Sequence, residues 1–126
     1  MLQDAKKILI IDEYGFSRIC SAILANLGYD VTITTVSDLT LSLNVRDFDL
    51  VVMSYPYCIP VFDKIGWKNT PIIILADNFD ENLIRELDTF ESSYCMIKPL
   101  DYEKFKLLAK EVISGEVSLQ GGYNIV

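Results

Sequence analysis

The amino-acid sequence predicts an α/β domain with a doubly wound, five-stranded parallel sheet in the flavodoxin-like strand order 2-1-3-4-5. Short apolar runs alternate with helix-like segments along the 126 residues, and alternation of this kind is typical of a parallel sheet covered by helices on both faces. The runs are continuous and rich in Ile and Val, as expected for strands buried on both sides. Right-handed crossover connections then give the doubly wound order.

The first half of the chain supplies two of these strands. Residues 6–12, KKILIID, form the first apolar run, and YDVTITTV at 29–36 forms the second. Between them, apolar residues at spacings of three and four predict a helix that ends at Gly28. Its expected core stripe consists of Phe16, Ile19, Cys20, Ile23, Leu24 and Leu27. A weaker helix is expected at 38–45, opened by Ser37 or Asp38.

The second half supplies three more strands, at 48–53, 71–76 and 94–97. The stretch between the first two of these, 54–71, leaves room for only one or two helical turns, around 61–67. A helix follows the fourth strand, with Asp77, Asn78 or Asp80 as its N-cap. The last helix begins after Asp101, ends at Gly115 and turns one face to the core through Phe105, Leu108, Ala109 and Val112. We therefore expect one domain at 1–115, and a tail or the start of a linker at 116–126.

Composition narrows the class of protein. No apolar run approaches the roughly 20 residues of a membrane span, and the N-terminus lacks the features of a signal peptide. We therefore expect a cytoplasmic protein, with no membrane partner and with its three cysteines reduced. The formal net charge of −7 argues against nucleic acid as a partner. The absence of histidine excludes a His-based triad and a His-ligated metal site.

Candidate functional residues follow the predicted strands, because the carboxyl ends of parallel strands are where open α/β sheets place their sites. The acidic pair Asp12 and Glu13 follows the first strand, and Ser54 follows the third. Ala76 ends the fourth strand, and Lys98 follows the fifth, directly before Pro99.

With this spacing, the chain resembles the receiver domain of bacterial response regulators. The resemblance covers about residues 6 to 114 and rests on ILIIDEYGFSRICSAILANLGYDV, FDLVVMS, PIIILA and YCMIKPL. It implies a phosphorylation site in which an acidic pair and an aspartate after the third strand bind Mg²⁺. That aspartate accepts a phosphoryl group from a histidine kinase, and a strand-4 Thr or Ser and a strand-5 Lys hold the phosphoryl oxygens.

Mapped onto this chain, the resemblance implies a degenerate site. Asp12, Glu13 and Lys98 match the pattern, whereas Ser54 replaces the acceptor aspartate and Ala76 replaces the hydroxyl residue. Mg²⁺ prefers charged oxygen ligands, so losing one carboxylate leaves weak Mg²⁺ binding at best, and we expect no cofactor. A neutral serine hydroxyl without a neighbouring base is also a poor acceptor. The purely structural interpretation of Ser54 is a small polar residue that fills space. That of Lys98 is an ion pair with the acidic residues rather than a contact to a ligand.

The aromatic residue that many receivers carry three positions before the lysine is also missing, since Cys95 occupies that position. Tyr94 is next to it, but adjacent strand residues face opposite sides of a sheet.

Three classes of function remain. The first is a phosphorylation-independent pseudo-receiver, not an enzyme, that acts by binding a protein partner or a second copy. The resemblance places its contact surface on Arg85, Glu86, Lys104 and Leu107, with the aromatic stretch 55–67 as the competing surface. The second is a working phosphoacceptor that uses another carboxylate, such as Asp77 or Asp12. The third is a small-ligand flavodoxin-like enzyme, but DEYGFSR after the first strand is acidic and holds one glycine, so it does not suit a phosphate.

Overall fold

The computed structural model describes residues 6–11, 17–35, 47–55, 70–78, 80–87, 93–97, 101–115 and 123–125. Its centre is a sheet in the order β2-β1-β3-β4-β5-β6, in which every neighbouring pair is parallel. The strands are β1 (Lys7–Ile11), β2 (Asp30–Thr34), β3 (Leu50–Tyr55), β4 (Ile72–Ala76), β5 (Ser93–Ile97) and β6 (Tyr123–Ile125).

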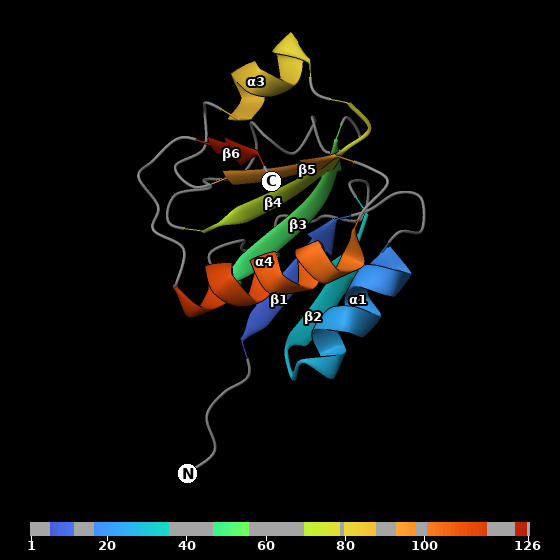
Figure 1. Cartoon of the computed structure of the whole chain (residues 1–126). Coiled ribbons are helices and arrows are strands. Elements are labelled where there is room, and N and C mark those ends of the chain that lie inside the picture. The colour runs from blue at the N-terminus through green and yellow to red at the C-terminus, as the bar shows by residue number, and fades with distance from the viewer. Residues whose placement is uncertain are drawn as a thin grey trace.

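Three described helices cover the two faces of this sheet (Figure 1). Helices α1 (Ser17–Asn26) and α4 (Tyr102–Ser114) lie together on one face, and α3 (Glu81–Leu87) lies on the other. The predicted doubly wound order of the first five strands is confirmed. The sixth strand was not predicted, and it lies within the segment expected to be a tail or the start of a linker.

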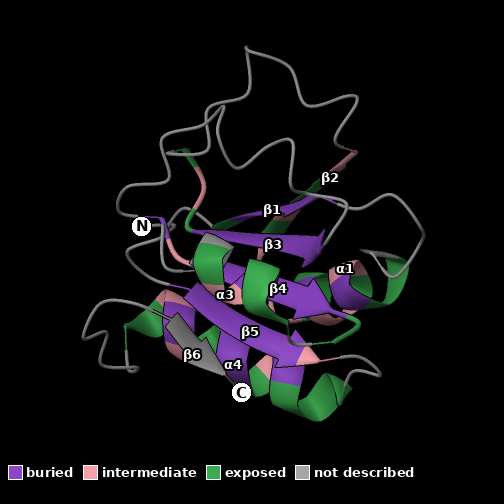
Figure 2. Ribbon diagram, turned by 90° about the horizontal axis from the view of Figure 1, so that it is seen from above, coloured by how far each residue is buried: buried purple, intermediate pink, exposed green. Residues whose placement is uncertain are grey.

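The core is divided by the sheet into two clusters, because successive strand residues point to opposite faces. In Figure 2 the central strands are buried along their length, with exposed helix surfaces outside them. The cluster on the α3 side contains Leu9, Ile11, Val51, Met53, Tyr55, Ile72, Ile74, Ala76, Leu83 and Cys95. The cluster on the other side combines alternate strand residues with side chains of α1 and α4, among them Cys20, Leu24 and Phe105.

The described helix ends follow the capping residues expected from the sequence. The Asp101 carboxylate accepts hydrogen bonds from the backbone N–H groups of Glu103 and Lys104, at 3.1 and 3.2 Å. At the other end of α4, Gly115 adopts the left-handed conformation, with φ of 77°, which a residue with a side chain adopts only under strain. Asp80 is the residue that caps α3, since its side chain accepts a 2.8 Å hydrogen bond from the Leu83 N–H.

The buried face of α4 is the predicted one, formed by Phe105, Leu108, Ala109 and Val112. Two expectations were wrong. Ile19 does not belong to the core stripe of α1, because it is 49% exposed, whereas Cys20 and Leu24 are fully buried. β3 does not end before Ser54 but continues through Tyr55, as the strand preference of tyrosine allows.

The helices expected at 38–45 and 61–67 lie outside the described residues. Within the described part of the chain, no helix combines the length and the apolar character that crossing a membrane requires.

Candidate functional site

The candidate site lies where the strand order reverses, between β1 and β3 at the carboxyl ends of the strands. β1 pairs with β2 on one side and with β3 on the other. The register sets Ile11, the last residue of β1, beside Met53 of β3. The next residue of β3 is Ser54, which therefore lies one position beyond the last residue of β1 in this register.

Ser54 is a strand residue with almost no exposed surface. It is 2% exposed and pairs with Leu75 of β4, which in turn pairs with Met96 of β5. The three residues form a row across the sheet, and its two apolar members belong to the cluster on the side of α1 and α4. Val52, two residues before Ser54 in β3, belongs to the same cluster. Because residues two apart in a strand share a face, the Ser54 side chain also points to the side of α1 and α4. The hydroxyl is thus enclosed by packing.

Ala76 lies on the opposite face of the sheet. It pairs with Tyr55 on one side and with Ile97 on the other, and it is fully buried in the cluster on the α3 side. Tyr55 belongs to the same cluster and is 6% exposed. The position where the resemblance requires a hydroxyl therefore holds a methyl group within an apolar cluster.

The charged members of the predicted site, Asp12, Glu13 and Lys98, lie outside the described residues. β1 is described up to Ile11 and β5 up to Ile97, the residues that immediately precede them. Within the described residues, no group of three or more Asp, Glu, Cys or His side chains is arranged to hold a metal ion. Asp77, the alternative carboxylate, is exposed directly after β4.

Tyr94 and Cys95 face opposite sides of the sheet, as the alternation predicts. Tyr94 packs on the α1 and α4 side, whereas Cys95 shares the α3-side cluster with Ala76. Burial raises the pKa of the Cys95 thiol to about 11 and also raises the pKa of the Tyr94 phenol above 10. The Tyr94 hydroxyl and the Ser93 hydroxyl are buried, and neither has a hydrogen-bond partner in the described structure.

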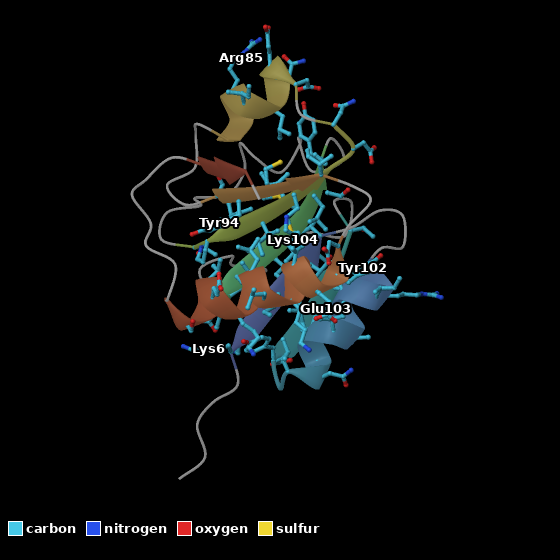
Figure 3. The ribbon with its side chains drawn as sticks, in the orientation of Figure 1. Lys6, Arg85, Tyr94, Tyr102, Glu103 and Lys104 are labelled. Atoms are coloured by element: carbon cyan, nitrogen blue, oxygen red, sulfur yellow. The ribbon has the colours of Figure 1, made fainter. Side chains whose placement is uncertain are left out.

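The predicted contact residues are split between two helices on either side of the β5–β6 edge (Figure 3). Arg85 is exposed on α3, where it donates a 3.4 Å hydrogen bond to Asn82. Lys104 and Leu107 are exposed on α4, and the Leu107 side chain retains 55% of its accessible surface. The backbone of Glu86 lies in α3.

Leu107 lies in a surface cleft of about 330 Å³ on α4, lined also by Asp101, Glu103, Lys104, Lys106 and Lys110. Its three lysines outnumber its two carboxylates by one, which makes it a cationic cleft with a leucine at its centre, in a chain whose net charge is −7. A second cleft of about 190 Å³ lies between α1 and α4 and is lined by Ile23, Asn26, Leu27, Tyr102, Glu103 and Lys106.

Sequence reasoning missed β6, which pairs with β5 through Ser93–Tyr123, Tyr94–Asn124 and Cys95–Ile125. The signal was present but short. A Gly-Gly pair punctuates the chain, and the aromatic–polar–β-branched triplet that follows it suits a strand. β6 covers the edge of β5 that would otherwise lie open between α3 and α4.

No family model and no curated protein matches the chain. Solved structures match it closely in fold and weakly in sequence. A CheY-like response regulator receiver domain protein from Methanospirillum hungatei superposes with a TM-score of 0.68 at 17% identity, over 90% of this chain and 97% of that one. A CheY-like response regulator from Mesorhizobium loti gives 0.67 at 18% identity, over 86% and 99%. A signal receiver domain of a two-component histidine kinase from Clostridium thermocellum gives 0.67 at 18% identity, over 86% and 97%.

Proposed function

We propose that this chain is a receiver-like signalling module that works without aspartyl phosphorylation, by binding another protein. The premise is its fold, which is that of CheY-like receiver domains. The observation that carries the proposal is the pair of substitutions at the ends of β3 and β4. Ser54 is enclosed beside Leu75, and Ala76 is enclosed beside Tyr55.

The chemistry of this pair argues against phosphoryl transfer. A serine hydroxyl needs a base to become a nucleophile, and the chain contains no histidine. A carboxylate at position 54 would also complete the Mg²⁺ ligands, since Mg²⁺ favours several oxygen ligands at about 2.1 Å. With serine there, Asp12 and Glu13 would form at most a weak cation site, with Lys98 as their charge partner.

An intact-mass measurement tests the absence of aspartyl phosphorylation. The protein is incubated with a small phosphodonor and Mg²⁺, beside an established receiver domain as a positive control. We expect no gain of a phosphoryl group while the control is modified. A gain that hydroxylamine removes would contradict the proposal, and peptide mapping would then show whether Asp12 or Asp77 carries the group.

The surface that we propose for partner binding is the cationic cleft of α4, together with the exposed face of α3 on the other side of the β5–β6 edge. Leu107 offers an apolar anchor, and Lys104, Lys106 and Lys110 offer charge around it. Such a surface suits an acidic partner with an apolar contact residue, because opposite potentials speed encounter and central apolar contacts hold the complex. The partner is a different protein or a second copy of this acidic chain.

Paired substitutions test this choice of surface. Leu107→Asp and Lys104→Glu should abolish binding of a partner, or self-association, without lowering thermal stability. Ile33→Asp is the matched control for Leu107→Asp, because Ile33 is 47% exposed on β2 at the far edge of the sheet. Lys6→Glu controls for the loss of a positive charge on an exposed residue. If the two controls weaken binding as much as the cleft variants, or if only substitutions in 55–67 do so, the surface is elsewhere.

A further inference from the structure

We propose that residues 123–125 are a displaceable cover on the edge of β5, and that this edge accepts the same segment from a second copy of the chain when the cover is open. The inference rests on the proposed function in one respect, namely that the covered edge lies between the two helices of the proposed contact surface. It is carried by the pairing of β6 with β5 and by the shortness of β6.

The first observation is that β5 accepts an added strand along its outer side. β6 is three residues long and pairs with β5 in parallel, beginning with Ser93 opposite Tyr123. Apart from this pairing, β5 would present an unpaired row of backbone N–H and C=O groups between α3 and α4 (Figure 1). Open edges of this kind bind extended segments through backbone hydrogen bonds.

The second observation is the small size of the cover. β6 is three residues long, and its register with β5 comprises three residue pairs. In a ladder only alternate residues of a strand donate to a given neighbour, so three residues offer few backbone hydrogen bonds to hold β6 on the edge. A strand held by so few bonds opens at a low free-energy cost, which makes an open state accessible.

The third observation concerns the occupant. The segment known to fit this edge is the chain's own YNI triplet, and every copy of the chain carries it. A second copy therefore needs no new complementarity to pair with β5, because exchange between copies reproduces the pairing already made within one copy.

A labelled peptide with the sequence of residues 119–126, LQGGYNIV, provides the probe. The 126-residue protein is compared with a variant of the same length that carries Asn124→Pro and Ile125→Pro. In a ladder, alternate residues of a strand donate to a given neighbour, so one of the two prolines removes a donor to β5. Ser118→Pro, which adds a proline to the same stretch of sequence outside β6, is the matched control.

We expect the proline variant to bind the peptide saturably and at least tenfold more tightly than wild type, and Ser118→Pro to behave as wild type. A peptide carrying the same two prolines should bind to neither protein. If the peptide binds wild type and the proline variant with equal affinity, β6 does not act as a cover on the edge of β5. If it binds neither protein, this edge does not accept an added strand. Circular dichroism and thermal melting establish that the variants are folded.

Hydrogen exchange in the 126-residue wild type supplies a second measurement, independent of the prolines. Amides of β5 that face β6 should exchange at least tenfold faster than amides of β3 and β4. Equal protection of these amides would contradict a displaceable cover. Neither measurement involves a phosphodonor or a foreign partner, so a failure here is distinguishable from failure of the proposed function.

Discussion

Replacing Tyr94 by Phe should stabilise the domain. The side chain is 2% exposed, and its hydroxyl is buried without a hydrogen-bond partner in the described structure. A buried polar group without a partner costs about 1–3 kcal/mol, and Phe keeps the ring while removing that group. We therefore expect the free energy of unfolding to rise by about 1–2 kcal/mol. With an unfolding entropy of about 2 cal/mol/K per residue, this raises the Tm of a chain this long by roughly 4–8 °C.

The advantage of Phe should grow in alkaline solution. Desolvation by burial raises the pKa of Tyr94 in the folded state, so the native phenol keeps its proton where the unfolded phenol loses it. The stability that wild type has with a protonated Tyr94 phenol is fully present below about pH 10 and is lost as the pH rises through the folded-state pKa. The Phe variant has no such loss.

Urea denaturation at neutral pH and above pH 10 measures both effects. Tyr102→Phe is the matched control, because Tyr102 is 37% exposed and the loss of its hydroxyl should change stability by less than about 0.5 kcal/mol. A loss of more than about 1 kcal/mol in Tyr94→Phe would refute the reasoning, since it would mean that the hydroxyl makes a hydrogen bond in the folded state.

Three further predictions concern Cys95, Asp101 and Ser54. Cys95→Ala should remove a loss of stability that wild type shows in alkaline solution. Because burial raises the pKa of the Cys95 thiol, the free energy of unfolding of wild type should fall by up to about 3 kcal/mol as the pH rises from 9 toward about 11. An equal alkaline loss in both proteins would contradict this assignment. Asp101→Ala should cost about 1 kcal/mol by leaving two N–H groups of α4 uncapped, whereas Asp101→Asn should cost less; equal melting temperatures would contradict the cap. Ser54→Asp should cost about 1–2 kcal/mol of stability in chelator, because the new carboxylate would be repelled by those of Asp12 and Glu13. Two like charges about 5 Å apart repel by roughly 3 kcal/mol at an effective dielectric of 20, and Lys98 would offset part of this repulsion. Millimolar Mg²⁺ should restore that loss in the variant more than it stabilises wild type, and equal shifts in both would place the acidic pair away from Ser54.

Most of the fold could be predicted because its signals are strong and local. Continuous Ile-rich and Val-rich runs mark the buried strands, and the four buried residues of α4 recur at helical spacing. The Asp101 cap and the Gly115 stop fix the ends of α4 for conformational reasons that the residue types alone indicate.

The errors occurred where tertiary context decides. Ile19 has the spacing of a core residue, yet α1 is turned so that Cys20 and Leu24 take the buried positions instead. β6 needs the edge of β5 to form at all, and a triplet of residues carries too little periodicity to indicate a strand by itself.

Around the candidate site, the side-chain directions in β5 were predictable, whereas the extent of β3 was not. The alternation of side chains along a strand predicted that Tyr94 and Cys95 would face opposite sides of the sheet. It could not predict that Tyr55 would continue β3 and pack in the same cluster as Ala76. An aromatic residue before a proline suits a loop as well as a strand, and the pairing of Tyr55 with Ala76 decides between them.

The direction of β6 changes where the polypeptide leaves the domain. Because β6 runs parallel to β5, Ile125 lies toward the same rim of the sheet as the carboxyl ends of the other strands. A chain that ended with α4 would leave from the opposite rim, since a crossover helix runs antiparallel to the strands that it joins. A fluorophore or fused protein attached after Ile125 would therefore start on the rim that carries Ser54, and its linker length would decide whether it obstructs access to that rim.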